Sequence, residues 1–369
     1  MAQIEYFLGA NSAAGFYSLY DHLIDRETAQ GLYILKGGAG CGKSSFMRRV
    51  ASHAQAAGYQ AEFILCSGDP DSLDAVILPE LKVALVDGTA PHVIEPKYPG
   101  VVERYVNLGK YYDSAGLQEV RAAVMEQTKE YQKHYKRCYR CLSAAAELDS
   151  DNRELMLTHE TEARLLKRAK GIIARELKGN GSGGEVALRF LSGVSCAGRM
   201  SLWGTVEAQC KRVCVLEDSF GLSNVMLEPI LAAATARDFH VIACPDPMAP
   251  ERLLHLLIPE LDLAFVTSTP EQPYPGRTFR RIRLDVMAKE TYRKFRSRVR
   301  FARKVSNALQ EEAMAALEQA KARHDDLEAL YNPYVDFDGV YSLADQVAAL
   351  IIPEGATASP QPRPADSKA

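Results

Sequence analysis

The segment GGAGCGKS, residues 37–44, places four glycines around one lysine and one serine. Glycine allows the tight turns that aim several backbone N–H groups at one anion. A lysine ammonium adds a fixed positive charge beside them, and a serine hydroxyl is an oxygen ligand of the kind that Mg²⁺ accepts. This combination predicts a site for a polyphosphate and its metal ion.

The spacing of Gly37, Gly42, Lys43 and Ser44 matches the P-loop pattern in full. We expect Lys43 to reach the terminal phosphates and act in catalysis, and Ser44 to bind Mg²⁺. The helix that follows adds the partial positive charge of its N-terminus. The expected nucleotide-binding residues are Gly37, Gly38, Ala39, Gly40, Cys41, Gly42, Lys43, Ser44 and Ser45.

A carboxylate follows an apolar run downstream. Residues 83–86 are all apolar and end at Asp87, which resembles the Walker B pattern. A carboxylate at this place holds the Mg²⁺ ion directly or through water. The second metal ligand beside Ser44 is therefore predicted to be Asp87.

The group that would orient an attacking water is harder to find. Many ATPases carry a glutamate directly after the Walker B aspartate, and here that residue is Gly88. The two candidates for this catalytic role are Asp69, expected at a strand end, and His92, five residues past Asp87. Glu80 recurs as Glu260 in the second half of the chain, which favours a role in the fold.

The elements around these residues are predicted from hydrophobic patterning. Residues 31–36 and 82–88 are continuous apolar runs, typical of strands in a parallel sheet covered on both faces. Residues 60–68 predict another strand, and 45–58 a helix that ends at Gly58. We expect an α/β fold of βαβ units.

The chain is predicted to be a tandem repeat. FLGANSAAGFYSLY (7–20) matches FLSGVSCAGRMSLW (190–203) at seven of fourteen positions. ILPELKVALVDGT (77–89) matches LIPELDLAFVTST (257–269) at six of thirteen, as one core strand written twice. The expected division is a P-loop domain at 1–178, a flexible linker at 179–184, a second domain at 185–352 and a disordered tail at 353–369.

The second copy lacks the chemistry of the first. EDSFGLSN, residues 217–224, stands where GGAGCGKS is expected, so Lys43 faces Ser223 and Gly38 faces Asp218. Thr267 replaces Asp87. Carboxylates at a phosphate position repel phosphate. We therefore expect a degenerate P-loop-like domain that supports or regulates the first.

Each copy is predicted to end in a helical stretch that forms a hairpin. The first is 115–178, interrupted at 148–152, and the second is 288–331. Residues 289–304 hold eight Lys or Arg and one Glu. A solvated helix face is the simplest interpretation of that charge, ahead of a protein partner or an arginine aimed at the nucleotide. A nucleic-acid contact is a further alternative, and the acidic net charge argues against it.

Composition excludes several classes of protein. The 369 residues carry a formal net charge of −3, which gives no general attraction to nucleic acid or to an anionic membrane. The sequence shows neither an apolar run long enough to span a bilayer nor a secretory signal. The eight cysteines are scattered, and the single CxxC pair, Cys138 and Cys141, fits two core cysteines better than zinc. The expected location is the cytoplasm.

The motifs together resemble a family of uncharacterised bacterial tandem P-loop ATP-binding proteins, typical of Firmicutes. The resemblance rests on FLGANSAAG, LKGGAGCGKSSF, CSGDPDSLDAVILPEL and VALVDGTAPH, followed by the degraded second round. It implies two tandem P-loop NTPase domains and ATP binding at 37–44 with Asp87. It implies no particular substrate.

Three functions agree with these residues. The first is a slow Mg²⁺-dependent ATPase that works as a nucleotide-driven switch. The second is a small-molecule phosphotransferase with Asp69 as base, and the third is an ATP sensor without turnover. ATP is preferred to GTP because the chain has no Asn-Lys-x-Asp segment. We also expect the two halves to pair, with an arginine from 277–283 or 293–303 approaching the γ-phosphate.

Overall fold

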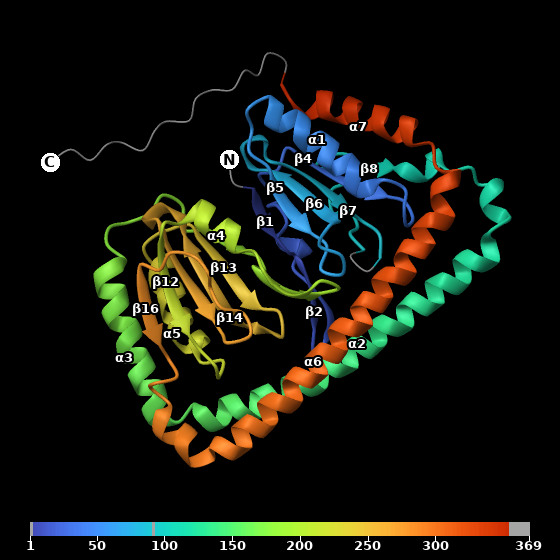
Figure 1. Ribbon diagram of the computed structural model, residues 1–369. Helices are drawn as coiled ribbons and strands as arrows, with labels where there is room; N and C mark the ends of the chain where they lie inside the picture. Colours follow the sequence, from blue (N-terminus) through green and yellow to red (C-terminus); the bar gives the residue numbers. More distant parts are fainter. Residues whose placement is uncertain (1–2, 91–92, 354–369) are drawn as a thin grey trace. The chain divides into compact units, whose positions relative to one another are not determined.

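The computed structural model describes residues 3–90 and 93–353 (Figure 1). It is an α/β structure with two six-stranded mixed sheets. The tail expected at 353–369 lies outside the described residues except for Pro353. Within the described ranges, no helix combines the length and the apolar character needed to cross a membrane.

The chain forms two compact units that are each assembled from separate segments. The larger unit contains Met1–Leu23, Ile64–Ser72 and Val120–Leu330, and the smaller one contains Ile24–Phe63, Leu73–Glu119 and Tyr331–Ala369. The boundaries of these two units differ from those of the domains expected at 1–178 and 185–352. Those boundaries stay a prediction about domains.

The smaller unit contains the glycine-rich segment. Strands β6 (Leu73–Leu78), β7 (Val83–Asp87), β4 (Gly31–Lys36) and β8 (Glu103–Asn107) lie side by side in this order. Helix α1 (Lys43–Ala56) packs on β6 and β7, and the C-terminal helix α7 (Phe337–Ile351) packs along α1 (Figure 1). The first sheet also includes β1 (Ile4–Tyr6) and β5 (Glu62–Leu65), the latter shorter than the strand expected at 60–68.

The prediction of a parallel sheet is only partly right. β4 runs parallel to β7 and β8, and the apolar runs of β6 and β7 are buried as expected. However, β6 runs antiparallel to β7, so the sheet is mixed. The reason is a tight connection, the 3-10 turn Pro79–Leu81, which returns the chain beside the strand that it has just left.

The repeated stretch is therefore a hairpin and not one strand. In the second copy β14 (Ala249–Ile258) and β15 (Leu263–Ser268) are joined by the matching turn Pro259–Leu261. Lys82 and Asp262 both follow their turn with φ 52°. Glu80 accepts the backbone N–H of Gln60 at 2.8 Å, and Glu260 accepts that of His240 at 2.9 Å. Since 60 and 240 are related by the same offset of 180, both glutamates hold the turn.

The second sheet lies entirely in the larger unit, in the order β16-β12-β15-β14-β13-β9. The strands not yet placed are β16 (Arg280–Arg283), β12 (Arg212–Glu217), β13 (Val241–Asp246) and β9 (Val186–Leu188). Helix α5 (Ser223–Thr235) packs on β13 and β14, and α3 (His159–Glu176) packs on α5. Their apolar faces share one core with the sheet, and α4 (Trp203–Gln209) contacts β1.

The long helices form one antiparallel pair, contrary to the two separate hairpins that we expected. α2 (Arg121–Met156) and α6 (Lys289–Tyr331) run together over much of their length (Figure 1). Cys138 and Leu142 from α2 form a core with Ala313 and Leu317 from α6. α2 also continues through the break expected at 148–152, because the Asp149 carboxylate accepts hydrogen bonds from Ser306 and Gln310 of α6.

Two matching small hairpins meet in the larger unit. They are β2 (Gly9–Ser12) with β3 (Gly15–Ser18), and β10 (Ser192–Ser195) with β11 (Gly198–Ser201). Just before them, Phe7 and Phe190 exchange two backbone hydrogen bonds of 2.9 Å each. The same residue of each repeat thus pairs with its own counterpart. The segment 179–184, expected as a linker, is itself tied by the Gly181 N–H to Arg237 O at 2.7 Å.

Candidate functional site

The glycine-rich loop joins β4 to α1 in the smaller unit, as the sequence predicts. Phe46 and Met47 anchor the first turn of α1 in the core with no exposed surface. Gly40 (φ 66°) and Gly42 (φ 83°) have left-handed backbones that only glycine adopts easily. A Cβ on Gly37 would lie 2.5 Å from Cys41 Sγ. The shape of the loop therefore requires glycine at these three positions.

The Lys43 ammonium is folded over this loop. Its Nζ donates to Gly37 O at 3.0 Å and to Gly38 O at 2.6 Å. It also lies 3.6 Å from Asp87 Oδ2, and both side chains are 13% exposed. The structure thus brings together the lysine and the carboxylate that the sequence assigned to one site.

Asp87 and Ser44 offer oxygen atoms that suit Mg²⁺. The other carboxylate oxygen of Asp87, Oδ1, accepts from the backbone N–H of Thr89 at 2.8 Å and from its hydroxyl at 2.6 Å. Ser44 Oγ accepts the N–H of Leu73 at 3.0 Å and keeps a second lone pair. A carboxylate and a hydroxyl are hard ligands of the kind that Mg²⁺ prefers. Lys43 would have to release Asp87 Oδ2 for an ion to use it.

Gly88 has a steric reason to lack a side chain. A Cβ on Gly88 would lie 2.4 Å from Ile34 Cγ2 and 3.2 Å from Lys36 Cε. Lys36 Nζ donates to Gly88 O at 2.7 Å and to Ile94 O at 3.2 Å, which fixes this turn. A glutamate therefore does not fit directly after Asp87.

Tyr112 belongs to the loop, and sequence reasoning missed it. Its hydroxyl oxygen accepts the Gly38 N–H at 2.8 Å, so this donor, which we expected to face a phosphate, has a partner within the chain. The Tyr112 ring lies 5.7 Å from that of Tyr331. Burial, and then the neighbouring Cys41, raise the pKa of Tyr112. No motif marks this tyrosine, which lies just after the 3-10 turn Leu108–Tyr111.

Helix α7 supports the loop from behind. A Cβ on Gly42 would meet Val340 Cγ1 at 3.5 Å and Phe337 Cδ1 at 3.6 Å. At the other end of the contact, Asp345 pairs with Arg49 at 2.5 Å and with His53 at 2.9 Å. These two partners lower the pKa of Asp345 to about 2. The sequence placed this helix in the second copy, whereas the structure packs it on the helix of the first.

Of the two candidate bases, the structure describes only Asp69. Asp69 belongs to the larger unit, where it accepts the Ser72 hydroxyl at 3.0 Å and pairs with Lys321 at 3.5 Å. His92 lies outside the described residues. Of the expected arginines, Arg280 pairs with Glu176 at 2.9 Å and Arg303 with Glu271 at 2.7 Å, all within the larger unit.

The degenerate loop of the second copy holds a carboxylate where the first copy has Gly38. Asp218 is 2% exposed and accepts the N–H groups of Phe220 at 3.0 Å and Ser223 at 2.6 Å. Asn224 Oδ1 accepts the Leu253 N–H at 2.7 Å, as Ser44 Oγ does for Leu73. The second copy thus keeps the bond from its loop to the next strand, and its Asp218 side chain accepts N–H groups of its own loop.

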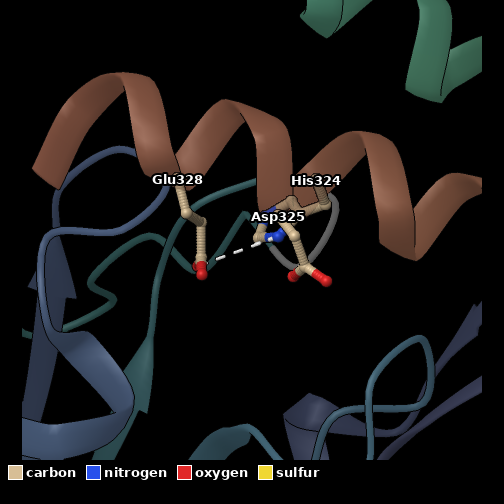
Figure 2. Close-up of side chains that lie close together, drawn as sticks. All are labelled: His324, Asp325 and Glu328. Carbon is tan, nitrogen blue, oxygen red and sulfur yellow. Dashed lines mark ion pairs between the residues drawn. The ribbon is translucent and has the colours of Figure 1, made fainter.

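One further cluster of possible metal ligands lies on α6, as Figure 2 shows. His324 Nδ1 is 3.7 Å from Glu328 Oε1, and Asp325 lies beside them. Asp325 is exposed and also pairs with Lys321. All three ligands come from adjacent positions on one helix, and nothing from another element joins them in the described residues, so we assign no metal to them.

Comparisons with protein-family models, curated proteins and solved structures found no match to this chain. The resemblance to tandem P-loop proteins therefore stays a prediction.

Proposed function

We propose that the smaller unit binds ATP with Mg²⁺ through the loop 37–45, and that the chain is a slow ATPase acting as a nucleotide-driven switch. The observation that supports this most is the convergence of Lys43 Nζ on Gly37 O (3.0 Å), Gly38 O (2.6 Å) and Asp87 Oδ2 (3.6 Å). An ammonium, a glycine-rich loop and a strand-end carboxylate close to one another have the composition of a phosphate and Mg²⁺ site.

The residues of the loop have distinct roles in this proposal. Lys43 leaves the carbonyls of Gly37 and Gly38 and donates to phosphate oxygens. Ser44 and Asp87 hold the metal ion, which neutralises charge on the phosphates. Since Lys43 and Asp87 are paired in the present structure, the binding of ATP and Mg²⁺ also separates these two side chains. Binding therefore rearranges the loop, as a switch requires.

Slow turnover is proposed because Gly88 leaves no side chain directly after Asp87 to orient water. Gly88 has no room for a side chain beside Ile34, and the Asp69 carboxylate is engaged by Ser72 and Lys321. The same observation favours the second candidate, a sensor that binds ATP without turning it over. A turnover assay of the full chain with ATP and Mg²⁺ separates these two functions.

Isothermal titration calorimetry of the full chain with ATP and Mg²⁺ tests the proposal itself. We expect one site per chain, and a loss of affinity of at least about 100-fold in Lys43→Ala, because the only lysine of the loop is removed. Ser223→Ala, at the matching position of the second copy, is the control and should bind like the wild type. Two sites per chain, or unchanged affinity in Lys43→Ala, would refute the proposal.

A further inference from the structure

A cavity of about 230 Å³ lies within the larger unit, at the carboxyl ends of β12 and β15. We call it the second-sheet cavity. It is lined by α2 and α6, by the hairpin of β10 and β11, by the start of β14, and by the segments 218–223, 246–248 and 267–272. The carboxyl ends of parallel strands are where open α/β sheets bind ligands. The degenerate loop with Asp218 forms one wall.

Four arginines line the cavity, and they fall into two kinds. Arg199 donates to Gln310 Oε1 at 3.0 Å and Asn307 Oδ1 at 3.1 Å, and Arg303 pairs with Glu271 at 2.7 Å. In contrast, Arg153 and Arg252 form no ion pair within 4.0 Å in the described part of the chain. Only the second kind lacks a direct ion-pair partner among the described residues.

Arg153 and Arg252 are nevertheless held in place by neutral oxygen atoms. Arg153 donates to Ser150 Oγ at 2.7 Å, and Arg252 donates to Gly221 O at 2.6 Å. Burial, and then repulsion from Arg153, lower the pKa of Arg252. Two half-buried guanidinium groups that repel each other destabilise the fold unless an anion joins them.

The acids of the cavity balance this positive charge only from a distance: Asp246 interacts electrostatically with both arginines but forms an ion pair with neither. Asp218 is engaged by the N–H groups of Phe220 and Ser223, and Asp246 by that of Met248 at 2.9 Å. Burial raises the pKa of both carboxyl groups, which favours their neutral forms. The positive charge of the arginine pair is thus only partly balanced.

Asn152 gives a second, independent sign of a ligand. It is 6% exposed, it lines the cavity, and its Oδ1 has no hydrogen-bond partner among the described residues. Buried acceptors are normally paired, since leaving one unpaired costs free energy. Oδ1 is therefore open to a donor in the cavity, such as a hydroxyl or an N–H group of a bound molecule.

We propose that the second-sheet cavity binds a small anionic molecule, whose phosphate or carboxylate group is held by Arg153 and Arg252 and whose O–H or N–H group donates to Asn152. At about 230 Å³ the cavity is smaller than the roughly 300–1,000 Å³ of drug-sized ligand pockets, so the ligand is a small metabolite and not ATP. This site is independent of the function proposed for the loop 37–45.

The test uses the full chain with Lys43→Ala, so that the loop of the smaller unit does not contribute. The probes are glycerol 3-phosphate, malate and inorganic phosphate, titrated by calorimetry. We expect glycerol 3-phosphate or malate to bind, and which one binds distinguishes a phosphate ester from a carboxylate. Inorganic phosphate, which lacks the carbon-bound hydroxyl, should bind more weakly.

Variants then locate the binding. Arg153→Gln and Arg252→Gln should each weaken binding about 10-fold or more, because a charged hydrogen bond is lost. Asn152→Ala should weaken glycerol 3-phosphate or malate but leave inorganic phosphate unchanged. Arg298→Gln, which removes an exposed arginine paired with Asp151, is the matched control and should change nothing.

A readout without ligand completes the test. Arg252→Gln should raise the Tm of the free protein, because it relieves the repulsion from Arg153. Failure of all three probes to bind would overturn the proposal, and so would binding that Arg153→Gln and Arg252→Gln leave unchanged. A Tm that falls in Arg252→Gln would show that this arginine stabilises the fold and would also count against the site.

Discussion

Tyr112 contacts the glycine-rich loop through a single hydrogen bond. Its hydroxyl accepts the Gly38 N–H at 2.8 Å, which the phosphate of the proposed function would otherwise accept. Tyr112→Phe should therefore raise ATP affinity about five-fold, since a typical hydrogen bond contributes about 1 kcal/mol net. Tyr111→Phe, at the neighbouring position, is the control for calorimetry and should bind ATP like the wild type. Weaker binding in Tyr112→Phe would show instead that the phenol supports the bound state.

Asp87 should couple ATP binding to magnesium. Asp87→Asn removes the carboxylate that lies 3.6 Å from Lys43 Nζ and that we assign to the metal. With Mg²⁺, ATP affinity should fall, whereas without metal it should stay the same or rise because Lys43 is released. Titrations with and without EDTA measure the difference. Equal losses under both conditions would mean that Asp87 serves only the fold, through Thr89.

Asp149 should make stability depend on pH. Burial, and to a smaller extent Asp246 and Glu271, raise its pKa to about 6 from 3.8. A raised carboxyl pKa stabilises the folded state at pH below 3.8, and this contribution is lost as pH rises through 6. At about 1.4 kcal/mol per pKa unit the loss is at most about 3 kcal/mol.

Asp149→Asn should remove this dependence on pH. The free energy of unfolding of the variant, compared with that of the wild type, should therefore rise between pH 4 and pH 7, since the wild type loses stability as the pH passes the pKa of about 6. Urea denaturation at several pH values measures it. Asp151→Asn, an exposed change on the same helix, is the control. If the difference in the free energy of unfolding between wild type and variant does not change with pH, the raised pKa of Asp149 is contradicted.

At the scale of elements, α7 acts as a support for α1. Val340 is fully buried and faces the end of the loop at Gly42. Val340→Ala should lower the free energy of unfolding by an amount on the order of 2 kcal/mol and weaken ATP binding, because the loop loses its backing. Leu350→Ala, at a position of the same helix that is 78% exposed, is the matched control. If the Val340→Ala protein is destabilised but keeps its ATP affinity, α7 supports the fold and does not contribute to ATP binding.

The sequence predicts the local elements and misses their partners. The strand at 31–36, the loop and the start of α1 follow from short-range patterns, because periodicity and glycine chemistry are local properties. The apolar positions of α2 show which face is buried but not that α6 covers it. The hairpin turn at Lys82 was missed because its residue with φ 52° is a lysine, whereas glycine or asparagine usually marks such a turn.

The candidate site follows the same rule. Lys43, Ser44 and Asp87 carry their chemistry in motifs, so the sequence could place them. Tyr112 and Val340 act through contacts between distant segments, for which the chain has no motif. The pairing of distant segments depends on the tertiary packing of the whole chain, and no short stretch of sequence determines it.

At the scale of the whole molecule, Asn11 fastens three separate segments of the larger unit. It is 1% exposed, its Nδ2 donates to Ser67 O at 3.0 Å and Val194 O at 2.9 Å, and its Oδ1 accepts from Tyr139 at 3.2 Å. Asn11→Ala should lower the free energy of unfolding by about 2–4 kcal/mol, since buried carbonyls lose their donors. Tyr139→Phe, which removes only one of these bonds, should cost less in the same thermal melts. Equal effects of the two changes would refute this ranking.

The mutual bonds between Phe7 and Phe190 also impose an order on biosynthesis. At roughly 5–20 residues per second, a ribosome needs on the order of 10–40 s to reach Phe190 after making Phe7. Throughout that time the apolar N-terminal segment lacks its counterpart. The glycine-rich loop waits longer still, because α7, the helix that packs behind it, follows it by most of the described sequence. A nascent chain of this protein therefore carries the loop long before it has the helix that backs it, and a product truncated before α7 should depend on chaperones.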